Sequence, residues 1–285
     1  MIAQYIANGL LIGSLYACLA VGFSLIYGVL NIINVMHGSF VVLGAYVTIY
    51  CTQMLGLSPI ISALIGCAVM FAFGYLVQRT LINQVVTAPI FISFTLTFGL
   101  DLLLNNAMIQ AFTATPRSLI LDYGSVVVAG VTLSVARLGA MVLALVLTGL
   151  LYWLLRHSQM GRAIIAVRMD HHAARLLGIR VERVYAVTFG IGALMAAAAG
   201  GAMAVVFPIT PLLSGVFLGK AFVICVLGGL GSVPGALVGG LALGLLESFG
   251  AIAFGPQWST TVGFALMIIV LVVRPSGLVG RRGFE

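Results

Sequence analysis

The chain has 285 residues, of which 62% are hydrophobic and only 7% are charged, and its mean hydropathy is +1.23. Water-soluble globular domains carry about a quarter charged residues, so the composition excludes that class and predicts one membrane domain over residues 1–285. The net charge of +7 could indicate a nucleic-acid partner, but the arginines cluster beside apolar stretches without interleaved aromatic residues. Membrane topology explains them better, and no nucleic-acid partner is predicted.

Nine apolar stretches follow one another along the chain. A helix needs about 20 residues to cross a bilayer, and the seventh stretch is short. We therefore predict an all-α polytopic membrane protein with about eight or nine transmembrane segments. The stretches cover residues 6–26, 36–54, 59–76, 89–112, 138–155, 184–206, 216–227, 234–249 and 258–273. Glycine pairs four residues apart, at 9/13, 235/239 and 240/244, favour close packing of helices.

Two segments predict that one or two of the transmembrane helices are discontinuous. Residues 27–39 place Asn34 and His37 between apolar stretches, and residues 228–235 combine several glycines with a proline. Unwound backbone at membrane depth must face protein, water or substrate, so these segments are candidate walls of a translocation pathway. The candidate residues in them are Asn34, His37, Gly228, Gly229 and Gly231. The alternative, that each segment is an ordinary interfacial loop, stays open.

Four ionisable residues lie within or near apolar stretches, where such residues are functional candidates by default; one of them, Arg137, is close to a predicted border. For Asp101, beside Asn105 and Asn106, we predict an internal hydrogen-bond network. Glu247 is near the end of its stretch, which predicts an interfacial position. Lys220 is a further candidate for the translocation pathway; the alternative is a structural role, such as neutralising Asp101 or Glu247.

A basic segment predicts the orientation of the chain. Six of its thirteen basic residues lie between Arg156 and Arg183. Basic loops remain in the cytoplasm, so residues 156–183 and the basic C-terminal tail, 274–285, are predicted to be cytoplasmic. Residues 113–136 then form an external loop, whose alternating pattern permits a small hairpin.

The basic segment also contains a short helix with readable ends. Asp170 is suited to cap its first turn, and Gly178 is suited to the left-handed conformation that ends it. Steps of three and four residues place Ala173, Leu176 and Leu177 on one apolar face. A short capped helix with such a face suits docking onto another protein.

The motifs of common catalytic and nucleotide sites do not occur. No HExxH or GxSxG pattern is present, and GVFLGKAF has neither the glycine spacing nor the Ser or Thr of a phosphate-binding loop. The four cysteines are scattered singly in apolar stretches, without metal-ligand spacing, and are interpreted as small core residues. We predict no catalytic, metal or cofactor site in this chain, so a partner must supply any nucleotide energy.

Four segments together resemble the permease subunits of branched-chain amino-acid ABC importers of the LivH type. They are GLLIGSLYACLAVGFSLIYGVLNIINVMHGSFVVLGAY, GRAIIAVRMDHHAARLLGI, GKAFVICVLGGLGSVPGALVGGLALGLLE and RPSGLVG. They extend nearly from end to end of the chain, in the order and spacing of that family. The INxAHG motif of the family matches residues 33–38, with Met36 where alanine is usual.

The resemblance implies an importer of branched-chain or related amino acids in the bacterial inner (plasma) membrane, with a cytoplasmic C-terminus. Its implied partners are a second permease of the LivM type, two ABC ATPase subunits that bind the ATP, and a periplasmic substrate-binding protein. The predicted short helix matches the family's cytoplasmic coupling element, which implies coupling roles for Asp170, Ala173, Leu176, Leu177 and Gly178.

Two other classes remain as alternatives. A secondary transporter or channel for a small polar solute should carry coupling carboxylates near the membrane midplane, and only Asp101 is a serious candidate. An intramembrane enzyme should contain a nucleophile or a metal cluster, and the sequence offers neither.

Overall fold

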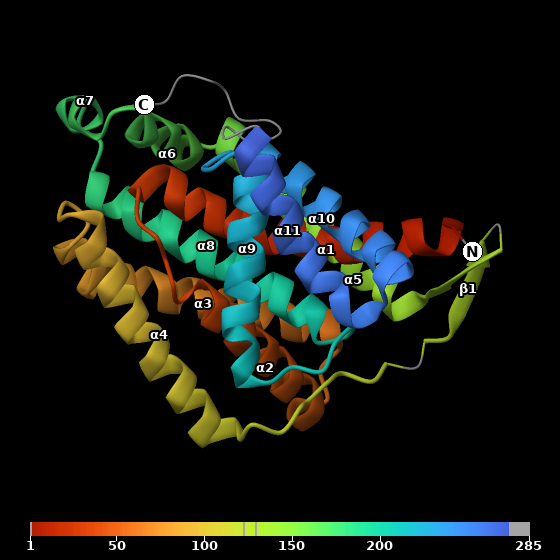
Figure 1. Ribbon diagram of the computed structural model, residues 1–285. Helices are drawn as coiled ribbons and strands as arrows, with labels where there is room; N and C mark the ends of the chain where they lie inside the picture. Colours follow the sequence, from red (N-terminus) through yellow and green to blue (C-terminus); the bar gives the residue numbers. More distant parts are fainter. Residues whose placement is uncertain (1, 122, 129, 274–285) are drawn as a thin grey trace.

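The computed structural model describes residues 2–121, 123–128 and 130–273, and Figure 1 shows them as one bundle of helices with a small two-stranded sheet. The α-helices are α1 (Ile2–Leu30), α2 (His37–Leu55), α3 (Pro59–Thr80), α4 (Ile90–Phe112), α5 (Val135–His157), α6 (Gln159–Met169), α7 (His171–Leu176), α8 (Val181–Met203), α9 (Ser214–Gly228), α10 (Val233–Phe254) and α11 (Ser259–Val273). Short 3-10 helices form at η1 (Ile82–Gln84), η2 (Pro211–Leu213) and η3 (Pro256–Trp258). Strands β1 (Ser125–Val128) and β2 (Val131–Ser134) pair antiparallel, which confirms the hairpin expected within residues 113–136.

In the described part of the chain, eight helical segments are long and apolar enough to cross a membrane. The prediction of an all-helical, multi-spanning protein is therefore confirmed. The ninth predicted stretch forms α11, which has 15 described residues and is shorter than a full span. The predicted cytoplasmic tail, residues 274–285, lies outside the described residues.

Helix boundaries follow local signals in the sequence. Ser58 caps α3 by accepting a hydrogen bond from a backbone amide of the first turn, and Pro59 follows at the first helical position. The same arrangement begins α10, where Ser232 is the cap and Pro234 lies in the first turn. Gly56 ends α2 in the left-handed conformation, which a residue without a Cβ atom adopts freely.

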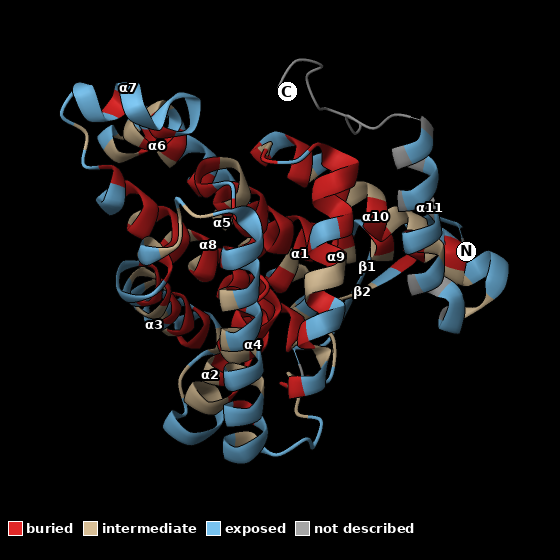
Figure 2. Ribbon diagram, turned by 60° about the vertical axis from the view of Figure 1, so that its left-hand side comes forward, coloured by how far each residue is buried: buried red, intermediate tan, exposed pale blue. Residues whose placement is uncertain are grey.

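The core of the bundle is built around α1 and α8, which Figure 2 shows almost entirely in the colour of buried residues. Glycines let α10 approach α1 closely. A Cβ atom at Gly13 would lie 2.9 Å from the Cα atom of Leu241, and one at Gly240 would lie 2.5 Å from the Cα atom of Ala17. These contacts confirm the packing role expected for the spaced glycines.

One end of the bundle gathers the N-terminal part of α1, the hairpin and two loops. The side-chain amide of Gln4 donates to the carbonyl of Thr132 and accepts from its backbone N–H, both at 2.9 Å. Nearby in sequence, Arg117 exchanges backbone hydrogen bonds with Ile209, which joins the loop after α4 to the loop after α8. The hairpin and both loops therefore belong to the same end of the molecule as the start of α1.

The opposite end of α1 lies beside the basic segment. A Cβ atom at Gly231, between α9 and α10, would lie 3.0 Å from the Cα atom of Gly28 and 3.7 Å from a guanidinium nitrogen of Arg168. The last turns of α1, the connection between α9 and α10 and the end of α6 are thus close together. This end also carries α7 (Figure 1).

Candidate functional site

The connection between α1 and α2 re-enters the bundle. Asn31 has a φ of 54° and ends α1, and the backbone stays non-helical until α2 begins at His37. The His37 Nε2 atom lies 2.9 Å from the carbonyl oxygen of Leu19. Leu19 precedes the end of α1 by eleven residues, which is about 16 Å of helix. Residues 31–36 therefore return the chain to roughly half the depth of α1, as the discontinuous-helix prediction for residues 27–39 required.

Two predicted pathway residues, Asn34 and His37, lie in this re-entrant segment and are fully buried. Within the described residues, both polar atoms of the Asn34 side chain and the Nδ1 atom of His37 have no hydrogen-bond partner. Buried polar atoms usually have partners, so this is a polar site enclosed by protein. The pathway role of these two residues stays a prediction.

Polar side chains on one face of α4 form hydrogen bonds with the re-entrant backbone. The same face continues along α4 to Asp101 and Asn105. The Thr97 hydroxyl accepts from the backbone N–H of Val35 at 3.3 Å and can donate to the carbonyl of Ile33 at 3.0 Å. Unpaired backbone groups are costly at membrane depth, and Thr97 pairs two of them. Thr97 was not predicted from the sequence, although its four-residue spacing from Asp101 was a usable signal.

Asp101 is the next member of this face and the twelfth of the 23 residues of α4, which places it at the middle of the helix. The Ser39 hydroxyl, on α2, donates to the Asp101 carboxylate at 2.5 Å. One turn further, the Asn105 amide donates to the Ser214 hydroxyl on α9 at 2.6 Å. These bonds join α2, α4 and α9 and confirm the internal network predicted for Asp101.

A second mid-membrane cluster joins α1, α9 and α10. The Lys220 ammonium donates to both carboxylate oxygens of Glu247 at 2.9 Å, and it also donates to the Tyr16 hydroxyl. Tyr16 in turn donates to Glu247 at 2.8 Å, and the ammonium lies 4.4 Å from the centre of its ring. Tyr16 is the fifteenth of the 29 residues of α1, so the cluster is near the middle of that helix.

The interfacial position predicted for Glu247 is wrong. Its side chain is only 10% exposed, and that of Lys220 is 11% exposed. The carboxylate lies inside the bundle because α10 continues to Phe254, two turns beyond it, and because an ionised group at this depth needs its cationic partner. Of the two partners suggested for Lys220, Glu247 is therefore the one in contact.

The glycines of residues 228–235 support close approach between backbones. Gly228 contacts Gly235 where the last turn of α9 meets the first turn of α10, and Gly229 has a φ of 100°, which L side chains rarely adopt. Gly231 faces Gly28 at the end that carries the basic segment. This connection joins two separate helices, and a pathway role for its glycines stays a prediction.

The short helix α7 has the ends that the sequence predicted. The Asp170 carboxylate accepts from the amides of His172 at 2.8 Å and Ala173 at 3.0 Å, and Gly178 has a φ of 81°. The bonds from Ala173 and His172 hold the pKa of Asp170 below its usual range. A depressed pKa means that this cap stabilises the helix at neutral pH and is lost as the pH falls through the folded-state pKa.

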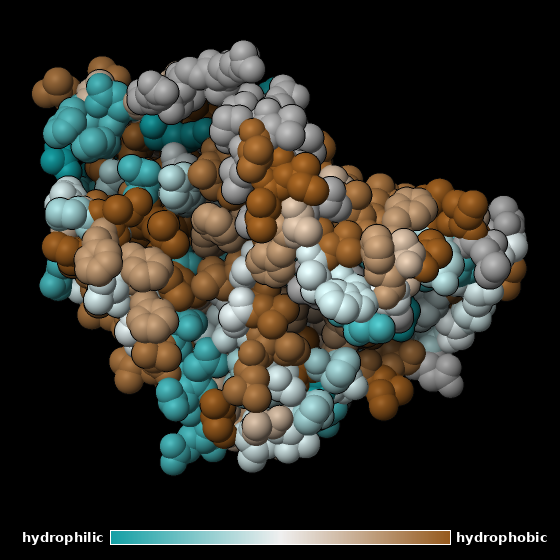
Figure 3. All heavy atoms as spheres, viewed as in Figure 1, coloured by the Kyte–Doolittle hydropathy of each residue, from teal (hydrophilic) through white to brown (hydrophobic). Residues whose placement is uncertain are grey.

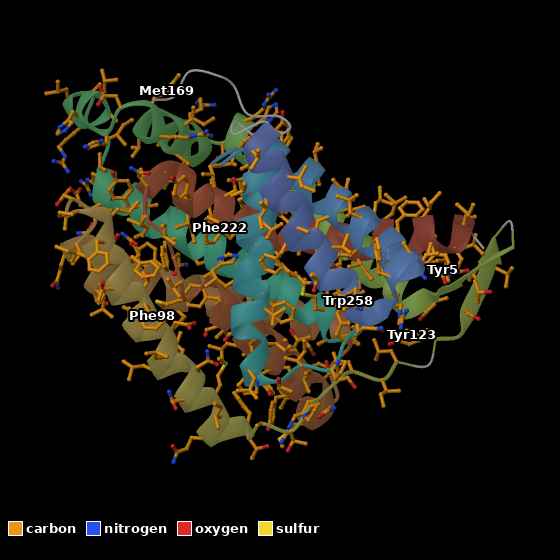
Figure 4. All side chains as sticks on the ribbon, viewed as in Figure 1. Tyr5, Phe98, Tyr123, Met169, Phe222 and Trp258 are labelled. Atoms are coloured by element: carbon orange, nitrogen blue, oxygen red, sulfur yellow. The ribbon has the colours of Figure 1, made fainter. Side chains whose placement is uncertain are left out.

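None of the described residues covers the apolar face of α7. Leu176 is 89% exposed, Leu177 is 80% exposed, and Ala173 is also exposed. Met169, at the end of α6, is labelled in Figure 4 and is 81% exposed. Figure 3 shows hydrophilic residues gathered around this end of the molecule. An apolar tip within a basic surface is typical of a protein-docking site.

Metal-binding and cysteine sites are sparse in the part of the chain that the structure describes. No three His, Cys, Asp or Glu side chains there are grouped so that they could hold a metal ion. Cys18, Cys67 and Cys225 are free and buried, as core residues would be, and Cys51 is partly buried.

The helical bundle, its paired charges at mid-membrane depth and its exposed capped helix define a polytopic membrane protein of the kind to which permease subunits belong. Residues 5–271 match the family described as the permease component of the branched-chain amino acid transport system, and the chain belongs to that family. The earlier resemblance is thereby confirmed, as are the transport function and the absence of an ATPase domain from this type of subunit.

Two relatives match the chain over nearly their whole length. The high-affinity branched-chain amino acid transport system permease protein BraD of Pseudomonas aeruginosa is 35% identical over 303 residues, covering 99% of this chain and 97% of that protein. LivH of Escherichia coli K12 is 33% identical over 299 residues, covering 99% and 96%. Among solved structures, PsaBC from Streptococcus pneumoniae in complex with Fab aligns over 97% of each chain, with a TM-score of 0.49 and 13% identity.

Proposed function

We propose that this chain is one of two permease subunits in a bacterial inner-membrane importer of leucine, isoleucine and valine. The other subunits are a related permease of the LivM type, two cytoplasmic ABC ATPases and a periplasmic substrate-binding protein. The observation that carries the proposal is the exposed apolar face of α7, because a permease family member without its own nucleotide motif needs a surface on which an ATPase acts.

This surface would couple the motion of the ATPases to the permease. ATP-driven closure of the two ATPases would displace α7, and the short connections to α6 and α8 would carry the displacement into the bundle. Asp170 and Gly178 fix the two ends of the helix, whereas Ala173, Leu176 and Leu177 form its contact with the ATPase. The salt bridge between Arg175 and Glu182, at 2.7 Å, ties α7 to the start of α8.

The pathway is proposed to pass the re-entrant segment and α9. Asn34 and His37 belong to its wall where α1 and α2 are discontinuous, and Lys220 shapes that wall through its ion pair with Glu247. Gly228, Gly229 and Gly231 allow α9 and α10 to move against α1 at the end nearest the ATPases.

The orientation proposed from the arginines places residues 156–183 in the cytoplasm and residues 113–136 outside. We expect a cysteine at Ile120, which is 92% exposed, to react with an impermeant thiol reagent applied to intact cells, in a background without the native cysteines. A cysteine at the exposed Arg183 should react only after the cells are opened. Equal labelling of both positions in intact cells would contradict the orientation.

The transport proposal is tested in proteoliposomes with the complex of two permeases and two ATPases, to which the binding protein and radiolabelled leucine are added. We expect uptake that needs ATP and the binding protein, stops when the ATPases carry inactivating substitutions, and persists when ion gradients are collapsed. Uptake that follows an ion gradient without the ATPases would instead support the secondary-transporter alternative. Competition by unlabelled amino acids, amides and urea then defines the substrate class.

A further inference from the structure

We infer that the polar face of α4 binds the ammonium group of the amino-acid substrate, through the Asp101 carboxylate and the Asn105 side-chain oxygen, as the substrate crosses the membrane. The inference rests on the proposed function, because it takes an amino acid as the solute. It assigns a site that lies outside the pathway residues predicted from the sequence.

Charge balance singles out Asp101. Glu247 is paired with Lys220, whereas no Lys, Arg or His nitrogen of the described residues lies within salt-bridge distance, 4.0 Å, of Asp101. A carboxylate at the middle of a membrane helix is costly unless it meets a cation, a hydrogen-bond donor or water. Ser39 and the Asn105 amide supply two neutral donors, and the side chain remains partly exposed. The Asp101 carboxylate is therefore suited to bind a cation reversibly.

Asn105 adds a second acceptor on the same face. Its amide nitrogen is used by Ser214, while its side-chain oxygen is buried and has no partner among the described residues. Residues four apart on a helix are neighbours, and the Asn105 amide bonds the Asp101 carboxylate, so the free Asn105 oxygen lies on the same face as that carboxylate. A primary ammonium has three donors and no acceptor, which is the complement of this pair.

The flank of the same face is apolar and accessible. Phe94 and Phe98 stack with their ring centres 6.3 Å apart, and they are 38% and 46% exposed. Phe98 is labelled on α4 in Figure 4 and is three residues, or about one turn, before Asp101. Beside the acceptors there is thus an apolar surface for an aliphatic side chain.

The Asp101 face is the side that α4 turns toward the bundle, because Ser93, Thr97 and Met108 on the same stripe are the buried residues of this helix. Of the eight candidate spans, α4 has the smallest buried share, and Figure 2 shows it mostly exposed in front of the bundle. Lys220 cannot bind the ammonium group of the substrate, because its side chain is itself cationic and is paired with Glu247 and Tyr16. Asp101 is consequently the one mid-membrane carboxylate of the described residues that has no cation of its own.

The test compares variants of the assembled complex in proteoliposomes, with radiolabelled leucine as the probe. We expect Asp101→Asn to lower the rate of leucine uptake at least tenfold while the loaded binding protein still stimulates ATP hydrolysis. Asp101→Glu, which keeps the charge, should recover part of the rate. Asn106→Ala, which alters an exposed residue on the far side of α4, is the control and should transport within about twofold of the unaltered complex. Ser39→Ala removes a neighbouring donor but keeps the carboxylate, so it should lower the rate less than Asp101→Asn does.

Three results would overturn the inference. They are normal uptake by Asp101→Asn, an equal loss in Ser39→Ala, which would make the carboxylate a structural partner of α2, and failure of Asp101→Asn to assemble. If the unaltered complex does not import leucine with ATP, the proposed function fails independently of this site, because that result does not depend on any α4 variant.

Discussion

Replacing Lys220 with methionine alone should strongly destabilise the bundle. The substitution keeps most of the apolar stem but leaves the Glu247 carboxylate buried without a cation, and breaking a buried ion pair by removing one partner costs about 3–5 kcal/mol. That is comparable with a large part of the stability of a typical domain. We expect the yield of detergent-extracted, monodisperse complex to fall severalfold, together with a lower unfolding temperature.

A double variant tests whether the unpaired Glu247 charge causes the loss of yield. Lys220→Met combined with Glu247→Gln removes both charges and should restore most of the yield, because no uncompensated charge remains. Tyr16→Phe is the matched control in the same cluster, since it deletes only a hydroxyl and should have a smaller effect. A double variant as unstable as Lys220→Met would contradict this explanation, as would a single variant with normal yield.

The observed partners of the ionisable residues show what can and cannot be predicted from the sequence. The apolar setting of Lys220 showed that it needed a partner, but Glu247 lies 27 residues away in sequence and was judged by its position in its own stretch. The contact exists because glycines bring α10 against α1 and because α9 lies beside both, which is tertiary information. The internal network of Asp101 was predicted, but its partner Ser39 lies 62 residues away in sequence and was not identified.

Helices, caps and sharp turns were predictable because their signals are local. The discontinuity at residues 27–39 was likewise visible as polar residues between apolar stretches. Its depth was not, because that depth is fixed by His37 against Leu19 and by Thr97 against the unwound backbone. Serines and threonines such as Ser39 and Thr97 looked unremarkable in the sequence, since their hydroxyls acquire a role only when another helix presents a carboxylate or an unpaired amide.

Replacing Leu176 with aspartate should uncouple the complex without unfolding the permease. Leu176 is 89% exposed in this chain, so a charge there meets water and leaves the folded bundle intact. Against an ATPase the same carboxylate would be buried without a partner, which costs about 3 kcal/mol or more, or roughly a hundredfold in affinity. We expect normal permease yield with loss of the copurifying ATPases, or ATP hydrolysis without leucine uptake.

The control for this variant lies on the same short helix. His171→Asp introduces the same charge at an exposed position about half a turn away from the apolar face, at the end of the helix where a carboxylate is favourable. It should assemble and transport within about twofold of the unaltered complex, and Leu176→Met, which keeps an apolar side chain, should do the same. If Leu176→Asp supports leucine uptake at the normal rate with bound ATPases, α7 does not transmit their motion. The docking surface must then be sought elsewhere on the basic end of the bundle, where Met169 is the next exposed apolar residue.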